Sequence, residues 1–200
     1  MLIVFFAGVL LLGIASWVAP LCGADASRGQ GRTPPFEWPT FALRDQDDRP
    51  FAKQDLAGQV WIADFIDVEC GQTCSLLTRS LSELKRNSAG ARLVTFSVNR
   101  DDGPRALSRF TKSFPEFDGT TWRLLAADGE SFPRLAVDVG LAHSLEQMAK
   151  GYLAFSTKLF LVDRKGWVRG VYDGLRQEEL HRLQRDLAAL EREVVVSEQR

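Results

Sequence analysis

The chain has 200 residues, of which 45% are hydrophobic, so it is long enough to bury one sizeable core. It carries 25 lysine and arginine residues against 26 aspartate and glutamate residues, giving a formal net charge of −1. This balance argues against nucleic acid, or any strongly anionic surface, as a partner.

The N-terminal segment differs in kind from the rest. Residues 2–22 contain no charged side chain, and about 20 apolar residues suffice to cross a bilayer as a helix. Residues 1–26 are therefore predicted to be a hydrophobic helix, either a cleaved signal peptide or a retained membrane anchor. Cys22 is a poor candidate for lipidation, because the bulky Leu21 precedes it. Either alternative places the following domain on the periplasmic or extracytoplasmic side, where disulfides persist.

Residues 27–40 are rich in glycine, proline and small polar residues, a composition typical of a tether. A single domain is then predicted over residues 41–195, and residues 196–200 are expected to form a frayed tail. Residues 41–59 have the pattern of a short hairpin with a polar turn.

The hydrophobic pattern predicts the remaining elements of the domain. Residues 60–66 are apolar except for Asp64, which is the pattern of a strand buried on both faces. The other expected elements, in chain order, are a helix at 74–86, a strand at 91–98, a helix opened by Pro104, a weak strand at 120–127, a short helix at 132–137, two strands at 156–163 and 166–174, and a last helix with a stripe of Leu180, Leu183, Leu187 and Leu190. This order predicts an α/β protein of thioredoxin-like fold, with a mixed central sheet and helices on both faces.

Two of the three cysteines, Cys70 and Cys74, lie between the buried strand and the next helix. A helix N-terminus stabilises thiolate, the form that attacks disulfides and binds soft metals. The four-residue spacing brings both sulfurs to one side of a helical turn, so they can chelate copper(I) or zinc, or form a disulfide. Asp67 and Glu69 oppose thiolate formation and favour a bound cation. Metal binding and redox exchange are both favoured over a structural disulfide, because such a short loop makes an inefficient staple.

Other polar residues are weaker candidates. A carboxylate in a buried strand is costly unless it is paired or protonated, so Asp64 is expected either to move protons for the thiols or to bond a neighbouring side chain. His143 and Met148 lie in a predicted loop and are interpreted first as a surface histidine and a packing methionine. His181 is expected to be solvated on the last helix.

Three segments together carry a resemblance to a known family: VWIADFIDVECGQTC, FSVNRDDGP and FSTKLFLVDRKG. Over residues 38–175 the chain resembles the SCO/SenC family, whose members are membrane-tethered thioredoxin-fold domains. They carry copper to the CuA site of cytochrome c oxidase, or reduce its cysteines. The resemblance implies copper bound by Cys70 and Cys74. It also implies a cytochrome c oxidase subunit, or another exported cysteine protein, as the partner.

The chain departs from the family pattern at informative positions. Gly71 and Ser75 stand where the family usually has prolines, and Phe155 stands where it has a histidine as third copper ligand. Phenylalanine has no lone pair, so a site of two thiolates is expected to retain copper(I) and to bind copper(II) weakly. His143 is a weaker candidate for a replacement ligand. The alternative functions are a thiol–disulfide reductase for exported cysteines that does not use copper, and a non-catalytic paralogue.

Overall fold

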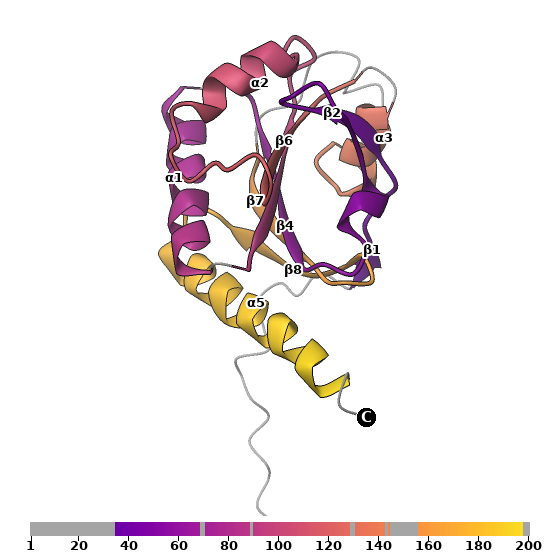
Figure 1. Ribbon diagram of the computed structural model, residues 1–200, viewed down its shortest axis with the longest axis vertical. Coiled ribbons are helices and arrows are strands. Elements are labelled where there is room, and N and C mark those ends of the chain that lie inside the picture. The colour runs from indigo at the N-terminus through magenta and orange to yellow at the C-terminus, as the bar shows by residue number, and fades with distance from the viewer. Residues whose placement is uncertain are drawn as a thin grey trace, which may run out of the picture. The chain divides into compact units, whose positions relative to one another are not determined.

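The computed structural model describes residues 35–68, 71–88, 90–128, 131–142, 144 and 156–197 (Figure 1). All of them belong to the second of two compact units of the chain, Arg32–Arg200. The predicted signal peptide or anchor at 1–26 lies outside the described residues. Five further residues discussed above also lie outside them: Glu69, Cys70, His143, Met148 and Phe155.

A single mixed sheet of eight strands forms the centre of the described part of the chain, in the order β1-β8-β7-β4-β5-β6-β2-β3. Strand β4 pairs in parallel with β5, and β5 with β6, while the other neighbours are antiparallel. The strands are β1 Phe36–Glu37, β2 Ala42–Asp45, β3 Pro50–Ala52, β4 Trp61–Ile66, β5 Arg92–Ser97, β6 Trp122–Ala126, β7 Ser156–Val162 and β8 Trp167–Asp173.

Helices cover both faces of this sheet, as the sequence predicted (Figure 1). The described helices are α1 Gln72–Asn87, α2 Pro104–Thr111, α3 Ser131–Asp138 and α5 Gln177–Ser197, with a 3-10 turn at Lys53–Leu56. Apolar side chains of α1, α2 and α5 share one core with the sheet, whereas those of α3 belong to the core on the opposite face. The two cores together make the thioredoxin-like layering that the sequence predicted.

Two hydrophobic patterns in the sequence, the apolar strand at 60–66 and the leucine stripe of the last helix, are buried in the structure as predicted. All six residues of β4 are buried, because the strand lies inside the sheet and has a core on each side. The predicted leucine stripe of α5 is buried against the sheet, from Leu183 at 0% exposure to Leu180 at 7%. His181 lies beside this stripe and is exposed, as predicted.

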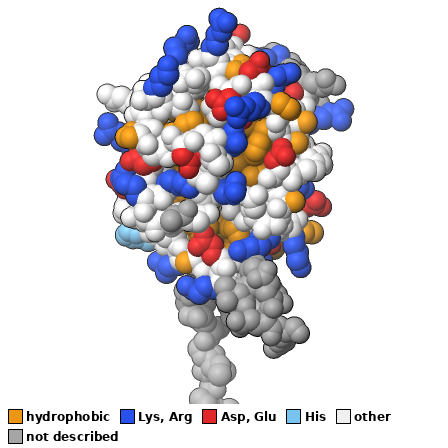
Figure 2. Space-filling model, viewed as in Figure 1, with side chains coloured by type: hydrophobic (Ala, Val, Ile, Leu, Met, Phe, Trp, Pro, Cys, Tyr) orange, Lys and Arg blue, Asp and Glu red, His pale blue; other side chains and the backbone are white. Residues whose placement is uncertain are grey.

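Figure 2 shows acidic and basic side chains interspersed over the face that it views, in keeping with the near-zero net charge. No helix among the described residues is both long enough and apolar enough to span a bilayer.

Regular structure extends beyond the predicted limits of the domain, residues 41–195, at both ends. Phe36–Glu37, within the predicted tether of residues 27–40, forms β1 and pairs with β8. Trp38 is fully buried, with its ring centroid 5.0 Å from that of Trp61 and 5.5 Å from that of Phe160. The average composition of residues 27–40 concealed the two aromatic residues Phe36 and Trp38. Trp38 is buried in the core and Phe36 packs against it partly buried, so together they anchor the segment. At the other end, α5 continues to Ser197, inside the predicted tail of residues 196–200.

The contribution of this segment can be measured with a tryptophan pair. Trp38→Ala is expected to lower the free energy of unfolding by about 3–5 kcal/mol, because it empties a fully buried site. Trp167→Ala is the matched control, since Trp167 is 42% exposed and its loss should cost about 1 kcal/mol or less. Equal losses for the two variants in denaturant titrations would contradict a folded role for residues 36–38.

Candidate functional site

The start of α1 places Cys74 at the edge of the core shared by α1, α2 and α5. Cys74 is the third residue of α1, directly beyond the C-terminal end of β4, and only 1% of its surface is exposed. It is disulfide-bonded, and the other two cysteines of the chain, Cys22 and Cys70, lie outside the described residues. Within the described ranges no group of three or more histidine, cysteine, aspartate and glutamate residues is arranged to hold a metal ion.

The two positions that lack the family's prolines have a local explanation. Gly71 is the N-cap of α1 and has φ +70° and ψ −132°, a conformation that proline, with φ fixed near −65°, cannot adopt. Ser75 donates both its hydroxyl, at 3.0 Å, and its backbone N–H, at 3.3 Å, to the carbonyl oxygen of Gly71. Proline at position 75 would remove both donors, so the chain closes this turn with a different set of bonds.

A buried carboxylate ties the approach to the cysteine pair to the next strand. Asp102 is 3% exposed, and its Oδ2 accepts hydrogen bonds from the Val68 N–H at 3.2 Å and from the Ser97 hydroxyl at 2.7 Å. Val68 lies just before the motif, so Asp102 positions the segment that leads into it. Sequence reasoning did not single out Asp102. The usable signal was the polar segment NRDDGP, which follows a mostly buried strand, where a buried carboxylate can bond free backbone N–H groups.

Asp64 bonds a neighbouring side chain, one of its two predicted roles. The Thr95 hydroxyl donates to Asp64 Oδ1 at 2.6 Å, and the Trp122 indole N–H donates to Thr95 Oγ1 at 3.0 Å. This chain of bonds crosses β4, β5 and β6. Asp64 Oδ2 has no hydrogen-bond partner among the described residues. Complete burial raises the pKa of Asp64 from its ordinary value of 3.8 to about 7, although the bond from Thr95 acts in the opposite direction. Its proposed role in moving protons for the thiols stays a prediction.

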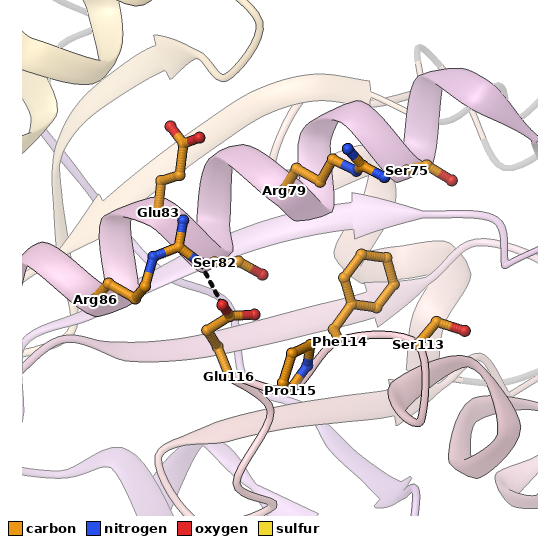
Figure 3. A pocket seen from close by; sticks show the side chains of 9 residues that line it. All are labelled: Ser75, Arg79, Ser82, Glu83, Arg86, Ser113, Phe114, Pro115 and Glu116. Carbon is orange, nitrogen blue, oxygen red and sulfur yellow. Dashed lines mark hydrogen bonds and ion pairs between the residues drawn. The ribbon is translucent and has the colours of Figure 1, made fainter.

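A groove begins at the motif and follows α1. Its first part, about 580 Å³, is lined by Val68 before the pair, by Gly71 between the two cysteine positions, and by apolar side chains including Leu76. Its second part, about 430 Å³, lies between α1 and the segment after α2, and Figure 3 shows the side chains that line it. A surface of this kind beside a reactive pair can hold part of a partner molecule.

The family model described as SCO1/SenC matches residues 30–190 of this chain, which is most of its length. The chain belongs to the SCO1/SenC family. A curated relative, the SCO1 protein homolog of Bacillus subtilis (strain 168), is 30% identical over 102 residues. That match covers 48% of this chain and 52% of the relative, so it spans about half the length of each.

Solved structures of the same family share the fold. A SCO1/SenC family lipoprotein from Bacillus anthracis str. Ames is 28% identical, with a TM-score of 0.66 over 78% of this chain and 97% of that chain. BsSco, described as a cytochrome c oxidase assembly protein with a disulfide switch, has the same TM-score at 23% identity, over 78% and 93%. Copper-bound ScoI of Bradyrhizobium japonicum has a TM-score of 0.56 at 16% identity, over 78% and 99%. The last two likenesses show the fold alone, while copper binding and oxidase assembly are properties of those relatives.

The strained start of α1 can be tested with two glycines that cap helices. Gly71→Ala is expected to lower the free energy of unfolding by about 1–2 kcal/mol, because an L side chain is disfavoured at φ +70°. Gly103→Ala is the matched control: Gly103 caps α2 at φ −69°, and a Cβ meets nothing within 4 Å at either site. A Gly71→Ala variant as stable as the Gly103→Ala variant in urea would contradict this conformation.

Asp64 makes stability depend on pH. The unfolded chain ionises Asp64 near pH 4 and the native state only near pH 7, so native stability falls as pH rises through this window, by up to about 4 kcal/mol. Asp64→Asn keeps an acceptor for Thr95 and carries no charge, so its stability advantage over the native chain should grow between pH 4 and pH 8. The exposed Asp101→Asn serves as control in the same urea titrations. A constant difference between Asp64→Asn and the native chain across this range would refute the assignment.

Proposed function

We propose that this protein is an exported assembly factor for cytochrome c oxidase that holds copper(I) as cargo on reduced Cys70 and Cys74. The observation that carries the proposal is the position of Cys74, which is buried, disulfide-bonded and located in the first turn of α1 directly beyond β4. The four-residue spacing makes Cys70 its proposed disulfide partner. Membership of the SCO1/SenC family supports the same role.

The donor chemistry supports copper(I) over copper(II). Two thiolates satisfy the linear coordination that copper(I) accepts, whereas copper(II) requires nitrogen donors as well. Phe155 supplies no donor at the position where the family has histidine. The helix N-terminus stabilises the thiolates, and the mostly buried Cys74 keeps one ligand away from water.

Copper loading then depends on the redox state of the pair. A disulfide offers no thiolate, so a dithiol reductant must first deliver two electrons and two protons to it. Binding of copper(I) to the resulting two thiols releases both protons. Protein redox state therefore gates metal binding, and the same two residues serve both reactions.

The disulfide at Cys74 also favours a second function, in which the protein reduces disulfides of exported targets without copper. One thiolate of the reduced pair attacks a target disulfide and forms a mixed disulfide, releasing one target thiolate. The second thiolate of the pair then attacks the mixed disulfide and releases the other target thiolate. Two electrons pass to the target, the pair is left oxidised, and a dithiol reductant is needed to restore it.

The two functions are separated by metal titration of the fully reduced chain. We expect one copper(I) ion to bind per chain in competition with a chromogenic chelator, and Cys74→Ser to weaken this binding by more than about 100-fold. Copper(II) should bind weakly, and Phe155→His should strengthen it. Ser80→Ala, which keeps both thiols and lies on α1 outside the groove lining, is the control for copper(I).

Two outcomes would count against copper as cargo. Tight, stoichiometric copper(II) binding by the native chain would refute the two-thiolate site. A reduced chain that binds no copper(I) but reduces a peptide disulfide would establish the second function instead.

A further inference from the structure

We propose that the groove along α1 docks an extended segment of the target polypeptide, and that Arg79 pairs with an acidic side chain two or three residues from the target's cysteine. The inference rests on the proposed function, since it takes the target to be a protein whose cysteine reacts with the pair. It adds a recognition surface and a sequence requirement for that target.

The groove is continuous from the cysteine motif onward. Its first part is lined by Val68, Gly71 and Gln72, the described residues that flank positions 69 and 70. Its two parts share Ser75 and Arg79 of α1, and Ser113 and Phe114 of the segment after α2. A chain that reacts with the motif therefore has a direct path along α1.

The part of the groove nearest the motif is apolar. Leu76 is 56% exposed, which is unusual for a leucine on a helix whose other leucines are buried. Opposite it stand Phe110 and Phe114, whose ring centroids are 5.0 Å apart. Figure 3 shows the Phe114 ring turned toward α1 at the level of Ser75 and Arg79. These three side chains can cover the apolar residues of a bound segment.

The groove also holds a cation that is available for a ligand. Arg79 is exposed and has no ion pair or hydrogen bond with any described residue, whereas Arg86, two turns further along α1, is paired with Glu116 (Figure 3). Three further basic side chains are exposed and have no ion pairs among the described residues: Arg105 and Arg109 of α2, and Lys112 directly after it. Glu83 lines the distal part of the groove. Arg79 is the charged residue that lines the proximal part of the groove, so it can pair there with an acidic side chain of a bound segment.

Helix geometry sets the position of the acidic residue. An α-helix rises 1.5 Å per residue, so Arg79 lies about 7.5 Å along α1 from Cys74. An extended chain advances about 3.3 Å per residue, so this distance corresponds to two or three target residues. From Gly71 to Arg86 the groove follows about 22 Å of helix, which accommodates six or seven extended residues. A concave surface of this length fits a peptide segment better than the face of a second globular domain.

The test uses the oxidised full chain and two heptapeptides with a central cysteine flanked by leucines. One peptide has glutamate at both ends, three positions from the cysteine, and the other has lysine. Each peptide thiolate attacks the protein disulfide, and a second peptide thiolate resolves the mixed disulfide, leaving a reduced protein and a peptide disulfide. We expect the acidic peptide to react about three- to tenfold faster, and this preference to disappear in high salt.

Variants assign the preference to the groove. Arg79→Glu should reverse it, and Leu76→Ser should slow both peptides without changing their ratio. Arg185→Glu makes the same charge change at an exposed site on α5 outside the groove and should leave the preference intact. Dithiothreitol, which is too small to use the groove, should reduce the native chain and these variants at equal rates.

The possible failures are distinguishable. Equal rates for the two peptides, with normal reduction by dithiothreitol, overturn the docking proposal and leave thiol exchange standing. No reaction with either peptide, with normal reduction by dithiothreitol, refutes exchange with polypeptide thiols as well. Concentration-dependent dimerisation in sedimentation that is lost in Leu76→Ser would make a second copy of the chain the occupant and would also overturn the proposal.

Discussion

The burial of β4 on both faces is the constraint on which the rest of the structure depends. A strand with no exposed face must lie inside the sheet, with a core on each side. The chain that leaves its C-terminal end continues into α1, which covers one of these two cores. This geometry brings Cys74 to the first turn of α1, where the helix terminus favours a thiolate. Burial of the strand and the position of Cys74 therefore have one origin. The same constraint makes Asp64 unusual, because a carboxyl group on this strand has no route to water.

Local hydrogen bonds hold the backbone on both sides of Cys70, between the end of β4 and the first turn of α1. Asp102 holds the backbone at Val68, before the motif, and the Gly71–Ser75 contacts close the first turn after it. Prolines in the family pattern would limit this turn by restricting φ, whereas here a glycine in a conformation closed to proline is held by hydrogen bonds. This chain therefore holds the turn with Gly71 and Ser75 by hydrogen bonds, where the family pattern would hold it with prolines. Cys74 lies within this turn, as the third residue of α1.

Patterns that depend on burial could be read from the sequence. The continuous apolar run of β4, broken only by Asp64, and the leucine stripe of α5 each fit one environment only, and Pro104 predicted the start of α2. Features that depend on a few long-range contacts could not. Trp38 lies in a segment whose average composition is that of a tether, and its burial requires partners far along the chain, such as Phe160. Asp102 and Arg79 were missed for the same reason, because their roles come from neighbours on other elements.

The loss of one ligand changes what the remaining features of the site must supply. With histidine in place of Phe155, a metal could define the site by its own coordination geometry. A copper(I) ion held by two thiolates alone determines only the linear arrangement of the two sulfurs. A dithiol without metal can exchange with any thiol or disulfide of similar reduction potential. Selectivity must then come from the protein surface around the pair. The groove along α1 begins beside that pair, and it combines an exposed leucine, two aromatic rings and an arginine with no ion pair among the described residues. A chain that discriminates among partners by their flanking residues has less need of a third ligand to do so.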